Sequence, residues 1–278
     1  MTTHTTPTRT AAVLTAATYV PSGVLIALVG IYAYLSSQMY AEALSDAAYA
    51  ASYWYGTLLM VLFAVIVIAV AVRIGVKQHV GKQWLLVGLG VASFALGDIV
   101  WTVLELHMGL DPYPSVADAF YVLEYVFFVV AMVLAIRSYR ELVPTRQPIV
   151  TGAVVAAALV VVVYLVLLGP YIFPAGVAEL GFWGLVVSTL YPLADVVLML
   201  APALTLALVI RKLGAGRLAW PWWVVVVGAL VFAVTDTAYS HADWAGTGLT
   251  SWLEMGWMAA NLIFAIAALV AREAYKVR

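Results

Sequence analysis

The chain has 278 residues, of which 65% are hydrophobic and only 10% are charged, and its mean hydropathy is +1.05. Because a soluble domain carries roughly a quarter charged residues, this composition excludes an ordinary soluble protein and indicates a polytopic membrane protein. The net charge of −1 gives no support to a nucleic-acid partner, and the lack of cysteine in the sequence excludes disulfides, thiolate metal sites and thiol chemistry.

Eight apolar runs, each close to the ~20 residues needed to cross a bilayer, are predicted as transmembrane helices. They cover residues 13–35, 53–76, 84–106, 116–138, 148–169, 183–210, 220–240 and 252–272. The first run is too long for the core of a cleavable signal, so we expect it to be retained as a helix. The sixth run contains Pro192 and Pro202, which predict a kink or tilt. The expected fold is an all-α integral membrane protein with eight transmembrane helices.

The connectors between these runs alternate between basic and base-free. All 13 Lys and Arg residues fall in the set that includes the two chain ends, whereas the connectors near 36–52, 107–115, 170–182 and 240–251 contain none. Basic loops stay in the cytoplasm because their translocation is costly against the membrane potential and anionic lipid. We therefore predict a multi-pass protein of the cell membrane, with the lipid bilayer as its surroundings and with both termini cytoplasmic.

An internal repeat relates the two halves of the sequence. With an offset of 138 residues, which becomes 136 after a short gap, it pairs Gly90 with Gly228, Phe94 with Phe232, Asp98 with Asp236 and Asp118 with Glu254. An even number of helices per copy gives both copies the same orientation, related by an axis along the membrane normal. We predict a cytoplasmic tail (1–12) followed by two parallel four-helix repeats (13–142 and 143–278). Chance similarity between apolar helices is the alternative explanation.

Carboxyl groups inside the predicted spans are the main candidates for a functional site. Intramembrane ionisable side chains are costly and usually turn toward a shared interior. Counted at 1.5 Å per residue from the basic helix ends, most of them lie in the outer half of the bilayer, and helical spacing places aromatic side chains on the same faces. The predicted ligand-binding residues are Asp98, Trp101, Glu105, Asp118, Tyr121, Glu124, Tyr125, Asp195, Asp236, Tyr239, Glu254, Trp257 and Asn261.

An acidic pocket with aromatic walls suits a cation, through charge and cation–π attraction, or a neutral polar ligand bound by protonated carboxyl groups. For Asp118 and Glu254, near predicted helix starts, capping of free backbone amides explains the residue type equally well. His107 and His241 lie near these acids and leave a metal site as an alternative, but the spacing typical of metal ligands is missing, so we predict none. The sequence indicates no particular cofactor.

The stretch from Gly97 to Tyr125 carries a recognisable pattern. It places a Gly-Asp-x-x-Trp segment at the end of one helix, a Pro-x-Pro-Ser-x-Ala-Asp connector after it, and tyrosines in the next helix. The residues in these places are Gly97, Asp98, Trp101, Pro112, Pro114, Ser115, Ala117, Asp118, Tyr121 and Tyr125. This pattern resembles the multi-span transmembrane sensor regions that precede diguanylate cyclase and histidine kinase domains in bacteria and archaea. The segments 191–199 and 236–239 look like counterparts in the second half of that family.

The resemblance implies an extracytoplasmic or intramembrane sensing module. Because no output domain follows Arg278 in this sequence, we expect it to signal through a separate membrane protein. The expected function is a receptor-like, non-enzymatic module that binds a small or cationic ligand in an outer cavity. A non-catalytic accessory subunit of a larger membrane complex is the first alternative, and a cation- or proton-coupled transporter is the second. The single asparagine of the chain is consistent with a thermophilic source.

Overall fold

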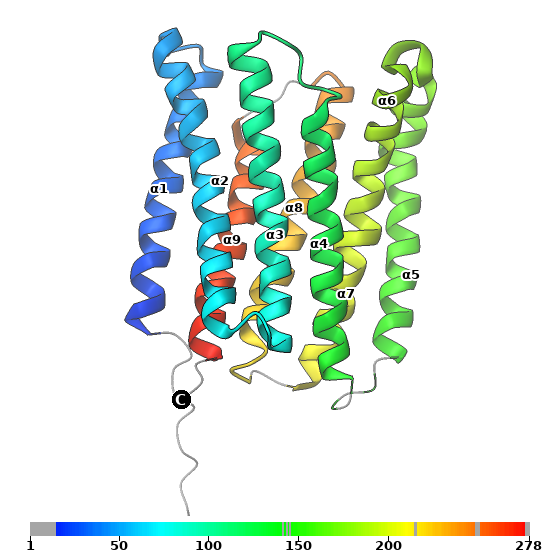
Figure 1. The fold of residues 1–278 in the computed structure, drawn as a ribbon. Coiled ribbons are helices and arrows are strands. Elements are labelled where there is room, and N and C mark those ends of the chain that lie inside the picture. The colour runs from blue at the N-terminus through cyan, green and yellow to red at the C-terminus, as the bar shows by residue number, and fades with distance from the viewer. Residues whose placement is uncertain are drawn as a thin grey trace, which may run out of the picture.

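The computed structural model describes residues 15–140, 142, 144, 146–213, 216–247 and 251–275. These residues form a bundle of long helices that stand side by side (Figure 1), and no β-strand occurs among them. Within this described part of the chain, seven helical segments are long and apolar enough to cross a membrane. The predicted class, an all-α multi-pass membrane protein, is confirmed at this level.

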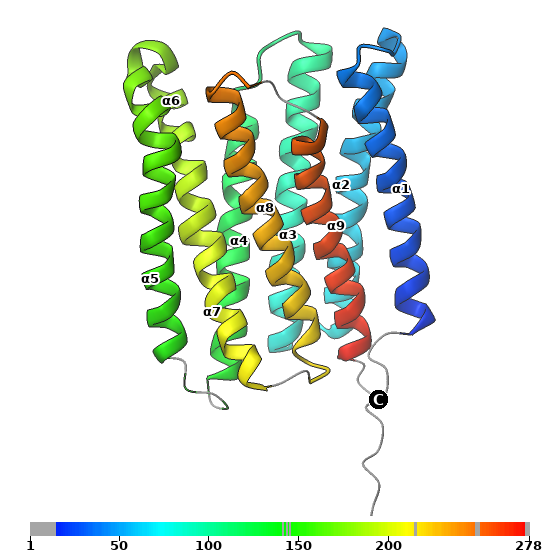
Figure 2. The same cartoon turned by 180° about the vertical axis from the view of Figure 1, so that it is seen from behind.

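The helices follow one another up and down the bundle. In the first half they are α1 (Ala16–Tyr40), α2 (Asp46–Ile74), α3 (His79–Thr102), which continues as the π-helical turn η1 (Val103–His107), and α4 (Val116–Tyr139). In the second half they are α5 (Arg146–Val163), the π-helical η2 (Tyr164–Ile172), α6 (Phe173–Ala194), the π-helical η3 (Asp195–Leu200), α7 (Ala201–Ile210), the 3-10 turn η4 (Arg211–Leu213), α8 (Trp220–Trp244) and α9 (Ser251–Ala274). α1 and α5 stand at opposite ends of the bundle (Figures 1 and 2).

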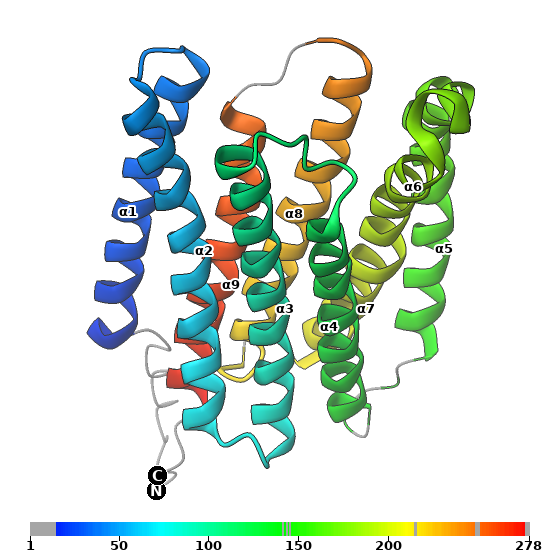
Figure 3. The same cartoon turned by 45° about the horizontal axis from the view of Figure 1, so that its top comes forward.

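The segment 146–210 contains a reversal of the chain. Gly176 and Gly181 have φ angles of 58° and 67°, a left-handed conformation that glycine adopts readily and that interrupts a right-handed helix. The chain turns back there, at the end of the bundle drawn at the top of Figure 1, so that α6 and α7 return alongside α5 (Figure 3). The stretch 170–182, expected as a connector, is thus mostly helical turns packed against η2.

The connector expected over 36–52 is much shorter in the structure. α1 continues to Tyr40 and α2 already begins at Asp46. Glu42 has a positive φ of 51°, and the side chain of Ser45 accepts the Ala48 N–H at 3.4 Å, which caps α2. Apolarity alone ends a predicted helix where polar residues begin, whereas these helices continue beyond the apolar stretch.

The bundle core contains aromatic pairs that join the first and second halves of the chain. The distances between ring centroids are 5.3 Å for Trp84 and Trp222, 5.8 Å for Phe94 and Phe232, and 4.4 Å for Phe128 and Phe264. All six side chains are buried. These pairs fill the middle and lower part of the bundle with apolar groups. Close van der Waals contact of this kind holds helices together inside a membrane.

Two glycines allow these rings to approach the helix backbones. A Cβ atom at Gly90 would lie 2.6 Å from the Phe128 ring, and a Cβ atom at Gly228 would lie 2.5 Å from the Phe264 ring. Both distances are far below van der Waals contact, so a larger side chain at either position would displace its ring. α3 meets α4, and α8 meets α9, through this same type of contact.

Candidate functional site

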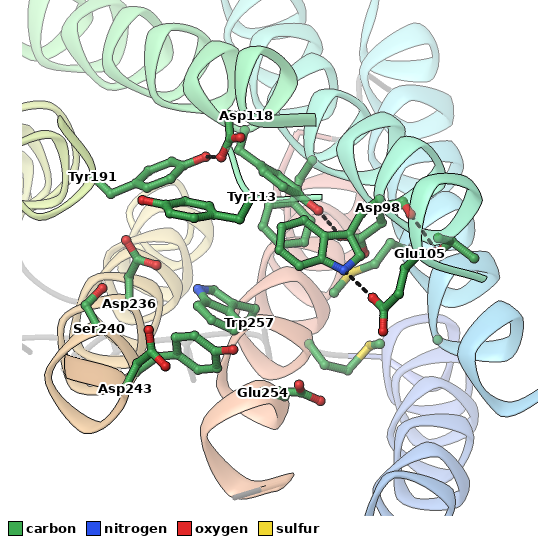
Figure 4. Close-up of a pocket in the computed structure, with 18 of the residues that line it drawn as sticks. Asp98, Glu105, Tyr113, Asp118, Tyr191, Asp236, Ser240, Asp243, Glu254 and Trp257 are labelled. Atoms are coloured by element: carbon green, nitrogen blue, oxygen red, sulfur yellow. Dashed lines mark hydrogen bonds between the residues drawn. The ribbon is translucent and has the colours of Figure 1, made fainter. Parts of the chain in front are cut away.

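A cavity of about 760 Å³ lies near the C-terminal ends of α3 and α8, and Phe94 and Phe232 are part of its lining. Figure 4 shows other lining residues. Side chains from α1, α2, α3, α4, α6, α8 and α9 line it. Among the predicted ligand-binding residues, ten face this one space: Asp98, Trp101, Glu105, Asp118, Tyr121, Tyr125, Asp236, Tyr239, Glu254 and Trp257.

The first wall is the end of α3 together with η1. Trp101 Nε1 donates a hydrogen bond to Glu105 Oε2 at 2.7 Å, and Tyr53 Oη of α2 donates to the same oxygen at 2.6 Å. Tyr121 Oη of α4 donates to Asp98 Oδ1 at 2.9 Å. Asp98 and Trp101 of α3 and Glu105 of η1, predicted at i, i+3 and i+7, therefore all lie on the cavity wall, each with an aromatic neighbour.

Asp118 caps a helix and also lines the cavity. Its Oδ2 accepts the Ser115 N–H at 2.6 Å while the Ser115 side chain accepts the Ala117 N–H at 3.1 Å, which forms a capping box at the start of α4. Its Oδ1 accepts a hydrogen bond from Tyr191 Oη of α6 at 2.6 Å. The carboxylate is thus a helix cap whose second oxygen remains at the cavity wall.

The opposite wall is formed by α8. Asp236, Ser240 and Asp243 form a column along this helix, and they face Asp98 and Glu105 across the cavity (Figure 4). Tyr239 of the same helix packs on Trp257 of α9, with ring centroids 4.7 Å apart. The side chain of Trp257 lies between the two acidic walls in Figure 4.

Three predicted ligand-binding residues, Glu124, Asp195 and Asn261, lie behind the lining, and each is 0% exposed. Tyr125 Oη donates to Asp195 Oδ1 at 2.9 Å and lies 3.4 Å from Asp236 Oδ2. Asn261 Nδ2 donates to the Trp257 carbonyl oxygen at 3.1 Å. Asp195 and Asn261 thus do not line the cavity themselves, but each is hydrogen-bonded to a residue that does.

Sequence reasoning missed a set of tyrosines and further polar residues in the lining: Tyr32, Tyr40, Tyr49, Tyr53, Asp111, Tyr113, Ser188, Tyr191, Ser240 and Asp243. The 138-residue offset could have indicated some of them. Tyr191 follows Tyr53 by this offset, and Asp243 follows the predicted site residue Glu105 by the same offset. The tyrosines of α1 could not have been found in this way, since nothing in the sequence of their own helix indicates which neighbouring helix they will face.

Tyr113 lies in the connection between α3 and α4 and reaches into the cavity. Its hydroxyl shares a hydrogen bond of 2.8 Å with Ser188 Oγ of α6. Burial raises the pKa of Tyr113 to about 12, so the phenol is neutral at ordinary pH and can offer either a donor or an acceptor.

The cavity lining is rich in acids and lacks bases. Seven carboxyl groups line it, and no Lys, Arg or His does so among the described residues. His107 instead accepts a hydrogen bond of 3.3 Å from Trp54 Nε1, and the His241 ring packs edge-on against Tyr171. In the described part of the chain, no three His, Cys, Asp or Glu side chains are grouped as metal ligands.

No family model matches the chain, and no curated protein or solved structure is significantly similar to it.

Proposed function

We propose that the protein is a receptor-like membrane module that binds a small cationic ligand in this cavity. The observation that carries the proposal is the lining itself, in which seven carboxyl groups and many aromatic side chains face one space without a basic residue among the described lining. Uncompensated acids inside a membrane protein are costly. A bound cation would offset that cost through its charge and through attraction to the faces of Trp and Tyr rings.

The tyrosine hydroxyl groups support this proposal because they orient the acids without neutralising them. Glu105, Asp98 and Asp118 each accept a hydrogen bond from a tyrosine. A carboxylate has roughly four acceptor positions, so each acid retains capacity for a ligand donor. Side chains held in place before binding lose little freedom when the ligand arrives, which favours affinity.

We also propose that the chain crosses the membrane eight times, as two parallel four-helix repeats. The reversal at Gly176 and Gly181 supports the eighth crossing, because it divides the segment 146–210 into two passes. Contacts across the bundle support the repeat. Residues that correspond under the offsets should meet near a two-fold axis, as Trp84 does with Trp222.

The proposed orientation places the cavity on the external side. Every described Lys and Arg lies at or beyond a helix end drawn at the bottom of Figure 1, whereas the cavity lies toward the top. Because basic segments stay in the cytoplasm, the lower face is assigned to it. The exposed lining residues Tyr40, Asp111 and Asp243 would then form a rim that an external ligand could enter.

The resemblance to sensor regions agrees with a receptor role, in which a separate membrane protein would carry the signal onward. A role as an accessory subunit is the alternative, favoured by the apolar face near the reversal, where Phe182 is 61% and Trp183 is 68% exposed. Transport has less support, since the buried Phe94–Phe232 and Phe128–Phe264 pairs occupy the space below the cavity where a route to the inside would run.

Thermal unfolding of the purified full chain in detergent micelles tests the proposal. The tert-butylammonium ion should stabilise the protein, by ~1.4 kcal/mol at ten times its Kd, and the neutral isostere tert-butanol should not. The double variant Asp98→Asn/Asp236→Asn should abolish this stabilisation, because it removes one charge from each of the two facing walls and keeps the side-chain shapes. Asp46→Asn is the matched control, because Asp46 is exposed at the same end of the bundle and does not line the cavity. Equal stabilisation by both compounds would contradict cation binding.

A further inference from the structure

The two acidic walls of the cavity are copies of one arrangement. Each consists of an acid, an aromatic residue and a second acid at i, i+3 and i+7 on one helix face. The first half-site comprises Asp98, Trp101 and Glu105, and the second comprises Asp236, Tyr239 and Asp243. Every member of the second half-site follows its counterpart in the first by 138 residues.

The neighbours of the half-sites correspond as well. Tyr121 of α4 donates to Asp98 Oδ1 at 2.9 Å, and its counterpart Trp257 of α9 lines the cavity together with Asp236. The ring centroids of Tyr121 and Trp101 are 6.5 Å apart, and those of Trp257 and Tyr239 are 4.7 Å apart. Each half of the chain therefore places an acidic helix face beside an aromatic pair.

The half-sites face each other across an aromatic interior. Figure 4 shows the acids of α3 and η1 on one side and those of α8 on the other, with Trp257 and Tyr113 between them. The floor between them is the edge-to-face pair Phe94 and Phe232, at 5.8 Å. The space is thus acidic at two ends and apolar in the middle.

Glu124 supplies an independent observation at the same place. Its carboxyl group is 0% exposed, and neither oxygen has a hydrogen-bond partner among the described residues. It lies between the cavity-lining Tyr121 and Tyr125 on α4, within electrostatic range of Asp98 and Asp236, one acid from each half-site. An unpaired buried carboxyl group is destabilising by itself, and its negative charge adds to the attraction of the neighbouring acids for positive charge.

We propose that the ligand of this cavity is a dication, with two ammonium ends joined by an apolar chain, as in the α,ω-diamines. This inference rests on the proposed function and specifies its ligand class. A protonated amine carries three N–H donors, which two carboxyl groups and a neighbouring aromatic face can satisfy together. The cavity of about 760 Å³ has room for both ends and the chain between them.

The distance between the half-sites sets the length of the chain. Helices in direct contact have axes ~8–10 Å apart, but two phenylalanine rings stand between α3 and α8 at the cavity floor. The half-sites are therefore farther apart than directly packed helices would place them. Affinity should rise with chain length until both ends reach their acids and then fall again.

Calorimetric titration of the purified full chain tests this inference, with diamines from diaminopropane to diaminooctane and with the monoamine of each length. The best diamine should bind at least about tenfold more tightly than its matched monoamine, because its second end binds intramolecularly. Glu105→Gln and Asp243→Asn should each reduce diamine affinity to nearly that of the monoamine. Monoamine affinity should change by no more than about twofold in either variant, since the other half-site remains intact. Asp46→Asn should change neither affinity.

Three results would overturn the inference. Two of them would leave the proposed cation-binding function standing, and the third would exclude it as well. If diamines bind no more tightly than monoamines, or if only one of Glu105→Gln and Asp243→Asn matters, the dication is wrong while a cation receptor stands. If no amine binds to protein that unfolds at its normal temperature, both the dication and the proposed cation-binding function are wrong.

Discussion

Tyrosine is the residue that makes the acidic cavity compatible with a membrane interior. Its hydroxyl group donates to a carboxyl oxygen in several pairs, among them Tyr53 with Glu105, Tyr121 with Asp98, Tyr125 with Asp195, and Tyr191 with Asp118. A basic residue in any of these places would satisfy the acid and cancel its charge. A neutral phenol satisfies part of the acid's hydrogen-bonding capacity and leaves the charge available.

Glu124 gives a residue-scale prediction, because its buried carboxyl group has no hydrogen-bond partner in the described part of the chain. Such a group costs ~1–3 kcal/mol of stability. Glu124→Leu, which is similar in volume, should therefore raise the free energy of unfolding by about this amount and weaken amine binding. Glu124→Gln is the control, since it keeps a buried polar group and should give a smaller gain. Chemical denaturation in micelles measures both, and a loss of stability in Glu124→Leu would indicate a partner for the carboxyl group.

The glycines beneath the aromatic rings give a second residue-scale prediction. Gly90→Ala should cost ~1–3 kcal/mol, because its methyl group would overlap the Phe128 ring in a packed core. Gly228→Ala should cost a similar amount through Phe264 if the two halves are equivalent. Gly30→Ala should be nearly neutral, since a Cβ there meets nothing within 4 Å. Chemical denaturation measures the free energy of unfolding of each variant. The same value for all three would show that the rings do not pack against Gly90 and Gly228.

At the scale of elements, the start of α4 combines a structural cap with a cavity wall. Ser115→Ala should cost ~1 kcal/mol of stability through loss of the cap, and it should also weaken amine binding, because the capping box helps to orient Asp118. Ser45→Ala is the matched control, since Ser45 caps α2 and does not line the cavity. Thermal unfolding and titration of both variants separate the effects. Weaker amine binding in Ser45→Ala as well would show that the effect is a general loss of stability.

How well the cavity-lining residues could be predicted from the sequence differed from helix to helix. The face carrying Asp98, Trp101 and Glu105 was predictable because helical spacing alone brings these residues together. The position of Glu124 behind the lining was not, although it is on the same helix as Tyr121, because rotation of α4 against its neighbours decides which residue faces the cavity. Tyr32 of α1 was missed for a related reason, since its role comes from packing between helices distant in sequence.

At the scale of the whole molecule, polar and apolar parts are separated along the bundle. The cavity and its acids occupy the upper part, and the Trp84–Trp222 and Phe128–Phe264 pairs fill the bundle below. The sequence indicated this separation correctly, because depth along a helix follows from counting residues. It could not show that Trp84 meets Trp222 or that Phe128 meets Phe264, since contact between helices distant in sequence is a property of the assembled bundle.

The topology gives the last prediction, and the natural chain suits its measurement because it contains no cysteine. Single cysteines can be introduced at four exposed positions, Glu42, Lys77, Glu179 and Lys212. With eight crossings and the basic face inside, Glu42→Cys and Glu179→Cys should react with a membrane-impermeant maleimide in intact cells. Lys77→Cys and Lys212→Cys should react only after the membrane is permeabilised.

The pair Glu179 and Lys212 distinguishes eight crossings from seven, because these residues lie on either side of the pass formed by α6 and α7. If the segment 146–210 crossed only once, Lys212→Cys would be labelled from outside, and the equivalence of the two halves would be lost with it. Labelling of Lys77→Cys in intact cells would instead reverse the orientation. The acidic rim would then face the cytoplasm, and the ligand would have to be an intracellular cation.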